Sequence, residues 1–475
     1  MIDEDGLPSV LANQSGLGFV VAPAGYGKTH LIATSVKHAN GRQLILTHTC
    51  SGVDSLRKKI YKLGVDSALF QVETISSWVL RMCLAYPAAS HWTNARPEKS
   101  DEWDGLNEAC AILLNTVFFK SVLRASYSGM YVDEYQDCSP KHHAIILLMG
   151  VIIPCRILGD PLQSIFNFPK KPTIDWKNDV EATFSRMGAL EKPWRWILGN
   201  QPALGEWIND RRIELTKKNM ISLSPLVLSG EKIVEIILSS SFDLIKNQQK
   251  VLESTSFGRA NVVAVMSGKR RDAANRIAKG SNGVFCSIEE MEGATLRSFL
   301  RKIDCGPAIR KIDHLNDFFE DCFVNGKSII FDEEYGVSEY DERREKTSTL
   351  VDALKDNFDS ANILALLLDV STRQDMIAYR EDLFFRCLDV FLNHMKGKTS
   401  YMDGYLSHQT QIRRDGRTIT NNRTISTTLL IKGLEYDISI VMDAASLSRE
   451  EMYVAITRAQ KKLIIITTQL NFFYA

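Results

Sequence analysis

The segment Ala22-Pro-Ala-Gly25-Tyr-Gly27-Lys28-Thr29 decides the fold around it, because it joins an apolar run to a helical pattern. The apolar run is residues 18–22, and the helical pattern covers His30 to His38. A phosphate chain is bound by converging backbone N–H groups, so its loop must bend where side chains would block the approach. Gly25 and Gly27 permit that bend. The alternative interpretation is a chance glycine-rich turn, but the flanking strand and helix favour a phosphate loop.

The loop also carries the side chains that a nucleotide requires. Lys28 supplies a charge to the β- and γ-phosphates, and Thr29 supplies a hydroxyl to Mg²⁺. The following helix adds the partial positive charge of its N-terminus. We therefore expect the nucleotide to be held by Ala22, Pro23, Ala24, Gly25, Tyr26, Gly27, Lys28 and Thr29.

An acidic pair follows another apolar run, Met130-Tyr131-Val132. Asp133 is placed to hold Mg²⁺ through water, and Glu134 is placed to polarise the attacking water. Alone, such a pair is usually the start of a solvated loop. Combined with the phosphate loop it predicts a P-loop NTPase, without indicating what the hydrolysis drives.

Short apolar runs alternate with helical patterns along the chain, which predicts a doubly wound, mostly parallel α/β sheet. Further strands are expected at residues 44–46 and 156–158, and a second sheet from residues 261–266, 438–442 and 463–466. Ligands bind at the carboxyl ends of such strands, where the polar residues fall. Residues 305–417 are helix-rich and include the acidic run 332–345, so they are expected to be an insertion.

Composition limits the possible functions. The chain has 475 residues, with 57 basic and 57 acidic side chains, so a globally basic, histone-like nucleic-acid binder is excluded. The nine cysteines lack zinc-finger spacing and indicate reduced thiols. The acidic N-terminus is unlike a signal peptide, and no apolar run is long enough to span a membrane. We therefore expect a cytoplasmic protein without a membrane partner.

The segment Asp133-Glu-Tyr-Gln-Asp137 resembles the second motif of superfamily 1A helicases of the UvrD/Rep/PcrA type. Further motifs of that family lie in order along the chain: residues 47–57 and 73–78 before this segment, and residues 158–168, 190–195, Lys432-Gly-Leu-Glu-Tyr436 and Tyr453-Val-Ala-Ile-Thr-Arg-Ala459 after it. The resemblance implies two RecA-like doubly wound parallel-sheet domains with helical insertions. It also implies a DNA-stimulated P-loop ATPase, with ATP and Mg²⁺ as cofactors, that moves 3′ to 5′ on single-stranded DNA.

The resemblance assigns roles to individual residues. Gln163 and Arg195 join Glu134 in catalysis, Arg458 acts as an arginine finger from the second sheet domain, and Glu435 contacts the nucleotide. Two guanidinium groups would stabilise charge developing on the γ-phosphoryl group. The residues expected to contact the DNA strand are Thr47, Arg57, Thr74, Phe166, Phe168, Trp194 and Thr427. Stacking requires exposed aromatics, but phenylalanine is more often a core residue, so both interpretations of Phe168 stay open.

The predicted domain boundaries follow the motifs. Residues 1–84 and 127–198 form the first RecA-like domain, and 85–126 form a small helical insertion in it. Residues 199–304 and 418–475 form the second RecA-like domain, and 305–417 form its helical insertion. The basic residues Lys269, Arg270, Arg271, Arg276, Lys279, Arg413, Arg414 and Arg417 could form a phosphate-binding surface or solvated helix faces.

Departures from the family pattern leave two functions open. Gln14 is too close to Lys28 to match the adenine-reading glutamine of the family, and Leu429-Leu430 replace polar residues. The first function is a translocase or helicase on single-stranded or tailed duplex DNA. The second is a DNA- or nucleotide-sensing ATPase that regulates a partner nuclease. The compact size is similar to that of small UvrD-like anti-phage subunits, such as the Gabija helicase-like component, which works beside an OLD-type nuclease. No nuclease motif is evident, and the sequence offers no guanine-reading element for a GTPase.

Overall fold

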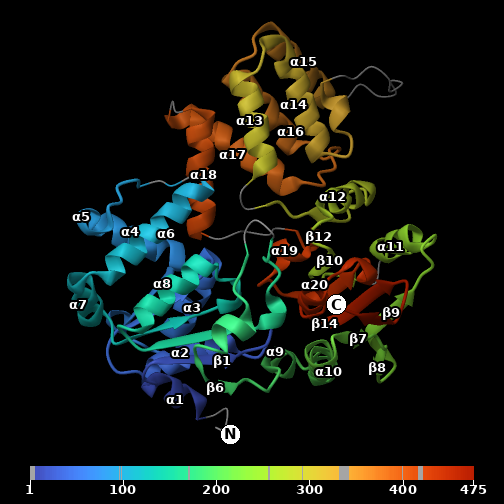
Figure 1. The fold of residues 1–475 in the computed structure, drawn as a ribbon. Coiled ribbons are helices and arrows are strands. Elements are labelled where there is room, and N and C mark those ends of the chain that lie inside the picture. The colour runs from blue at the N-terminus through green and yellow to red at the C-terminus, as the bar shows by residue number, and fades with distance from the viewer. Residues whose placement is uncertain are drawn as a thin grey trace. The chain divides into compact units, whose positions relative to one another are not determined.

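The computed structural model describes residues 6–95, 97, 99–168, 172–254, 257–290, 293–330, 342–397, 400–415 and 421–474. The chain divides into two compact units (Figure 1). The first unit comprises residues 1–221, 449–461 and 473–475, and the second comprises residues 222–448 and 462–472.

A six-stranded parallel sheet organises the first unit, with strand order β3-β2-β4-β5-β1-β6. Its strands are β1 (Leu17–Val21), β2 (Gln43–Thr47), β3 (Phe70–Thr74), β4 (Gly129–Val132), β5 (Cys155–Gly159) and β6 (Ser185–Ala189). Every residue of β2, β4 and β5 is buried. Continuous burial is typical of parallel strands covered on both faces, and it fits the apolar residues at the centre of these strands.

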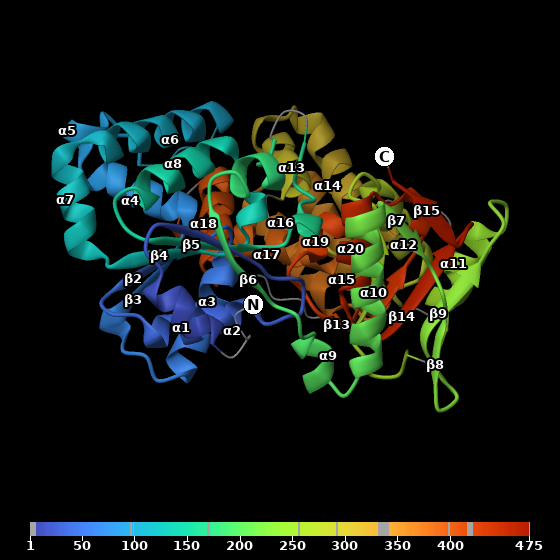
Figure 2. The same ribbon diagram turned by 60° about the horizontal axis from the view of Figure 1, so that its bottom comes forward.

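Helices cover both faces of this sheet, as Figure 2 shows. On one face α4 (Ile75–Ala85), α6 (Ser100–Asn115), α7 (Val117–Ser126) and α8 (Pro140–Gly150) share one core with the sheet, in which Trp78, Phe119 and Ile146 are completely buried. On the other face lie α1 (Leu7–Asn13), α2 (Lys28–His38) and α3 (Cys50–Lys62). The short α5 (Pro87–Ser90) and the helices α9 (Trp194–Leu198), α10 (Pro202–Lys218) and α20 (Arg449–Ile456) complete the unit.

No single helix among the described residues is long and apolar enough to cross a membrane. The pair α6 and α7 reaches the required length and composition together, but the two helices are bent by 88°.

A seven-stranded sheet organises the second unit, with order β11-β12-β10-β13-β14-β9-β8. Its strands are β8 (Leu226–Leu228), β9 (Glu231–Leu238), β10 (Val262–Met266), β11 (Cys286–Ser287), β12 (Arg423–Thr427), β13 (Tyr436–Val441) and β14 (Ala459–Thr467). The pairs β10–β12, β10–β13, β11–β12 and β14–β9 are parallel, and β8 pairs antiparallel with β9. The short strands β7 (Met220–Ser222) and β15 (Asn471–Phe473) lie where the chain passes between the units.

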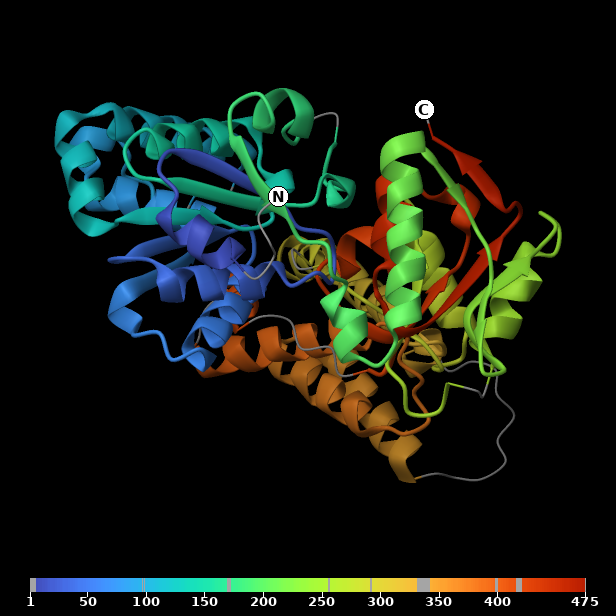
Figure 3. The ribbon, with the colours of Figure 1, turned by 90° about the horizontal axis from the view of Figure 1, so that it is seen from below.

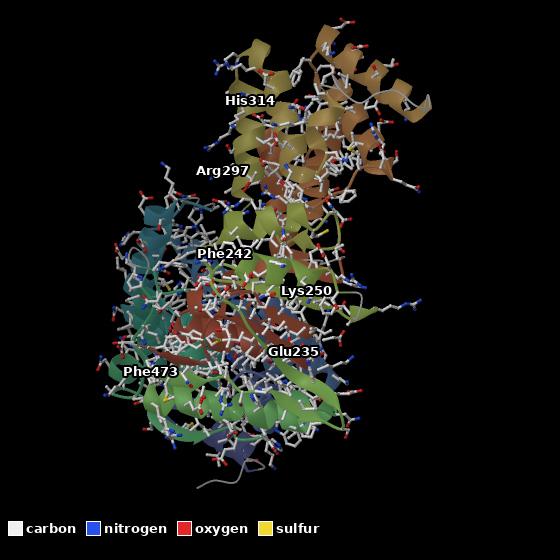
Figure 4. All side chains as sticks on the ribbon, turned by 90° about the vertical axis from the view of Figure 1, so that its right-hand side faces the viewer. Glu235, Phe242, Lys250, Arg297, His314 and Phe473 are labelled. Carbon is white, nitrogen blue, oxygen red and sulfur yellow. The ribbon has the colours of Figure 1, made fainter. Side chains whose placement is uncertain are left out.

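The second unit also contains a helical group with its own core. The group comprises α13 (Ala294–Cys305), α14 (Ala308–Cys322), α15 (Glu342–Asp356), α16 (Ser360–Thr372), α17 (Glu381–Gly397) and α18 (Tyr401–Asp415). Phe319, Leu367 and Phe391 are completely buried in that core, whose orange helices lie together in Figure 3. Figure 4 labels Arg297 of α13 and His314 of α14 on this group, above Glu235 of β9. The helices α11 (Leu244–Leu252), α12 (Arg271–Gly280) and α19 (Thr428–Ile431) accompany the sheet.

The predicted α/β class with doubly wound parallel sheets is confirmed, and every strand predicted from the sequence is present. The six-part domain division stays a prediction. Three segments are grouped differently from that prediction: residues 199–221, 449–461 and 473–475, all expected in the second sheet domain, belong to the first unit. The predicted acidic run 332–345 falls mostly on residues 331–341, which lie outside the described residues.

Candidate functional site

The predicted phosphate loop leads from the end of β1 to the start of α2. Gly25 (φ +78°) and Gly27 (φ +90°) both adopt left-handed backbone conformations, which a residue with a Cβ atom adopts only at a cost. Gly27 is the N-cap of α2, and its carbonyl accepts a hydrogen bond from the amide of Leu31 at 2.9 Å. The first amides of a helix have no intrahelical acceptor, so the start of α2 offers donors to an anion.

Lys28 lies between the loop and the acidic pair. Its Nζ is 2.8 Å from Oε2 of Glu134 and 4.0 Å from Oδ1 of Asp133, and the residue is only 8% exposed. Burial of the ammonium lowers its pKa, but the carboxylates of Glu134 and Asp133 outweigh burial, so the pKa of Lys28 is raised. The cation that would meet a phosphate is thus held charged by the two carboxylates.

The acidic pair follows β4 directly. Burial raises the pKa of Asp133 to about 7, although the nearby Lys28 ammonium acts in the opposite direction. The Oδ1 atom of Asp133 accepts a hydrogen bond from the amide of Glu134 at 2.9 Å. Glu134 has φ +53°, a conformation that non-glycine residues adopt rarely and that gathers at functional sites.

A chain of hydrogen bonds runs from Glu134 to the predicted catalytic Gln163. Gln136 is buried, and its Nε2 donates to Oε2 of Glu134 at 2.6 Å while its Oε1 accepts from the amide of Asp160 at 3.0 Å. The Nε2 of Gln163 then donates to Oδ2 of Asp160 at 3.2 Å. Gln136 and Asp160 had no assigned role in the sequence analysis, although both belong to the quoted motifs.

Arg195 also reaches the loop. Its amide donates to the carbonyl of Gly25 at 2.9 Å, and its guanidinium donates to the carbonyl of Thr457 at 2.7 Å. The neighbouring Trp196 is completely buried and donates from Nε1 to the carbonyl of Ala459 at 2.8 Å. Trp194 is 36% exposed and lies against Gly27, so this predicted DNA contact is at the phosphate loop.

Arg458 lies in the first unit, whereas the family resemblance placed it in the second sheet domain. The residue is only 1% exposed, and its guanidinium donates to the carbonyl of Val454 and to Oγ1 of Thr457, both at 2.9 Å. The hydroxyl of Tyr453 accepts a hydrogen bond from the loop amide of Ala24 at 3.3 Å. The bond from Ala24 to Tyr453 and those of Arg195 and Trp196 explain why residues 449–461 pack with the phosphate loop and its neighbours.

The other predicted strand-binding residues of the first unit gather at two places. Thr47 and Thr74 are register partners at the carboxyl ends of β2 and β3. The Oγ1 of Thr74 accepts from the amide of Ser77 and so caps α4, and Arg57 donates to the carbonyl of Val72 at 3.1 Å. Phe166 is half-buried and Phe168 is 43% exposed, both beyond the helical turn of residues 161–163.

The predicted residues of the second unit are more scattered. Thr427 is buried at the end of β12, next to Met266 in register, and Glu435 is exposed before β13. Most of the basic run is engaged by acidic neighbours: Arg270 pairs with Asp443, Arg271 with Glu289 and Glu290, and Lys279 with Glu320. These pairs favour the structural interpretation of that run. The side chains of Arg413 and Arg414 and all of Arg417 lie outside the described part of the chain.

Mg²⁺ fits the residues at the loop. A hydroxyl (Thr29) and a carboxylate (Asp133) match its preference for oxygen ligands. Within the described ranges no cluster of three or more histidine, cysteine, aspartate or glutamate side chains could hold a metal ion alone. Mg²⁺ normally takes only one or two carboxylates together with phosphates and water, so the donor set suits a metal that arrives with a nucleotide.

Comparisons with known proteins return only distant structural likeness. No protein-family model and no curated protein matches the chain. An arterivirus nonstructural protein 10 helicase in complex with DNA matches 97% of this chain and 62% of its own, with 11% identity and a TM-score of 0.37. A Pif1 helicase from Bacteroides in complex with ADP-AlF3 and ssDNA matches 54% of this chain and 58% of its own, with 13% identity and a TM-score of 0.26.

The helicase of PRRSV matches 98% of this chain and 55% of its own, with 10% identity and a TM-score of 0.33. The chain spans about three fifths of the length of these solved structures. Similarities this low assign no function to this chain.

Proposed function

We propose that the chain is an ATP-dependent DNA translocase or helicase of the UvrD type, moving 3′ to 5′ on single-stranded DNA. The observation that carries the proposal is the position of Lys28, between a left-handed glycine at a helix N-terminus and the carboxylates of Asp133 and Glu134. A buried lysine with two carboxylates beside a phosphate loop is the arrangement that nucleotide hydrolysis requires.

In this proposal the residues of the first unit have different roles in hydrolysis. The loop amides and Lys28 bind the β- and γ-phosphates, while Glu134 orients the attacking water. Arg195 and Arg458 stabilise charge on the transferred phosphoryl group. Thr29 and Asp133 would hold Mg²⁺, which neutralises charge between the β- and γ-phosphates when it is bound.

The hydrogen bonds from Glu134 through Gln136 and Asp160 to Gln163 support coupling between hydrolysis and the DNA strand. This series of hydrogen bonds ends at Gln163, next to the segment that carries Phe166 and Phe168, the predicted stacking residues. A change at Glu134 on hydrolysis would therefore reach the strand-binding segment through buried, hydrogen-bonded groups.

The test compares Lys28→Ala with Lys37→Ala, a change of an exposed lysine on the same helix. We expect Lys28→Ala to lose at least about 100-fold in ATP turnover, because it removes a principal phosphate ligand. Lys37→Ala should keep wild-type turnover. Equal turnover in the two variants would refute the assignment of the site.

A second function is favoured by the burial of the predicted strand contacts. Thr47 and Thr427 are almost inaccessible, and the hydroxyl of Thr74 is used as a helix cap. These positions offer little side-chain surface to a strand, which supports an ATPase that binds DNA and regulates a partner nuclease without processive unwinding. Strand displacement on a 3′-tailed duplex separates the two: a helicase displaces the strand, and a sensing ATPase hydrolyses ATP without displacement.

A further inference from the structure

An arginine outside every motif of the sequence analysis reaches the nucleotide site. Arg212 belongs to α10, and its side chain is 17% exposed. Its terminal nitrogen is 3.3 Å from Oδ1 of Asp160, whose side chain is fully buried. Burial lowers the pKa of Arg212, but Asp160 together with Tyr453 and Tyr26 outweighs burial, so the pKa is raised and the guanidinium stays charged.

The Asp160 carboxylate connects three segments of the chain. Its Oδ2 accepts from the phosphate-loop amide of Ala24 at 3.3 Å and from Nε2 of Gln163 at 3.2 Å. Its Oδ1 accepts from the amide of Leu162 at 3.3 Å and faces Arg212. A single carboxylate therefore holds the loop and the predicted catalytic glutamine.

The negative charge of the Asp160 carboxylate is unfavourable next to a nucleotide. Asp133, Glu134 and Asp160 all act electrostatically on Lys28, so three carboxylates surround the cation that meets the phosphates. A triphosphate adds further negative charge, and a buried carboxylate without a counter-charge is strongly unfavourable. Arg212 supplies the counter-charge for Asp160.

The same helix holds the loop at a second point. The buried hydroxyl of Tyr26 donates to Oδ1 of Asn209 at 2.9 Å. Asn209 and Arg212 are three residues apart, so both project from one face of α10. The helix thus contacts the loop through Tyr26 and, through Asp160, at Ala24.

We propose that Arg212 is a positioning residue of the nucleotide site, which neutralises Asp160 so that this carboxylate can hold Ala24 and Gln163 without repelling the triphosphate. The inference depends on the proposed ATPase function and names a residue of the site that no sequence motif marks.

The experiment measures KM and kcat for ATP in the full chain for wild type, Arg212→Met, Arg212→Lys and Arg211→Met. Arg211 is the matched control, because it is the adjacent arginine on α10 and pairs with Glu214 at 2.9 Å while lying over the ring of Trp207. We expect Arg212→Met to raise KM by about tenfold or more, since it leaves a buried carboxylate uncompensated. Arg212→Lys should restore KM to within about threefold, and Arg211→Met should match wild type.

A double variant, Arg212→Met with Asp160→Asn, separates charge from folding. Because it removes both charges, it should bind ATP more tightly than Arg212→Met alone, and it should regain folding if the single variant loses it. The inference would be overturned if the double variant had the same KM for ATP as Arg212→Met. It would also be overturned if Arg212→Met and Arg212→Lys raised KM equally.

The two proposals fail in distinguishable ways. If wild type hydrolyses ATP, Lys28→Ala does not, and Arg212→Met keeps the wild-type KM, the positioning role is wrong while the ATPase stands. If wild type neither binds nor hydrolyses ATP, the proposed function is wrong and the role of Arg212 is wrong with it.

Discussion

Substitution of Gly25 by alanine tests whether the phosphate loop is built against Trp196. A Cβ atom added at Gly25 would lie 2.7 Å from Cζ3 and 3.0 Å from Cη2 of Trp196, and 3.1 Å from Cβ of Arg195. The indole cannot turn away easily, because it is completely buried and its Nε1 donates to the carbonyl of Ala459. Gly25 also has φ +78°, so alanine brings backbone strain as well as a clash.

Gly64 provides the matched control. It lies in the same unit with φ +75°, and no described atom lies within 4 Å of its added Cβ. Gly64→Ala should cost only the left-handed backbone, about 1–2 kcal/mol. Gly25→Ala should cost that amount and a further ~1–3 kcal/mol for overpacking.

The assay is urea unfolding followed by tryptophan fluorescence. All seven tryptophans lie within residues 1–221, so the signal reports on the first unit. We expect a clearly larger loss of unfolding free energy for Gly25→Ala than for Gly64→Ala, together with loss of ATP turnover in Gly25→Ala alone. Equal losses of stability in the two variants would refute the packing of the loop against Trp196.

Three further predictions follow from burial and exposure. Arg458→Ala should lower kcat for ATP more than it raises KM. It should also reduce the unfolding free energy by about 2–4 kcal/mol, because a buried, hydrogen-bonded side chain is removed. An unfolding free energy equal to that of wild type, measured by fluorescence, would contradict the burial of Arg458. Phe168→Ala should weaken binding of a labelled oligothymidine by about 1–3 kcal/mol in fluorescence anisotropy, with unchanged stability because the ring is 43% exposed; unchanged affinity would show that the ring does not stack on a base. Burial lowers the pKa of His142 to about 4, so the unfolding free energy should be unaffected by this residue above about pH 6.5 and should fall by up to about 3 kcal/mol as the pH drops to 4. His142→Gln should flatten this part of the pH–stability curve, and an identical slope would contradict the burial of the imidazole.

The sequence predicted those parts of the molecule that depend on local signals. The phosphate loop is marked by a strand, two glycines and a lysine within twelve residues, and Asp133-Glu134 is marked by the apolar strand before it. Both appear where predicted, because parallel strands bring their carboxyl ends to one edge of the sheet.

Contacts between distant segments could not be predicted in the same way. The bond from Ala24 to Tyr453 joins residues 429 positions apart, and that from Trp196 to Ala459 spans 263 positions. No local pattern marks such pairs; residues 449–461 were placed in the second sheet domain from the family resemblance alone, and that division stays a prediction. Arg212 was missed for a related reason, because in a helix with several basic residues it reads as one more solvated side chain.

The side chain of Thr74 shows a different difficulty. A threonine that follows a strand and precedes a helix suits a phosphate contact, but it is also a favoured N-cap. The structure uses its hydroxyl for the cap of α4, which the sequence pattern alone does not separate from a role in strand binding.

The most direct test of the central claim is the rate of ATP turnover by the purified chain with and without single-stranded DNA, with Lys28→Ala as the control for contaminating activity. We expect turnover that increases when DNA is added and disappears in Lys28→Ala. Turnover that persists unchanged in Lys28→Ala, or none from the wild-type chain in either condition, would contradict the central claim.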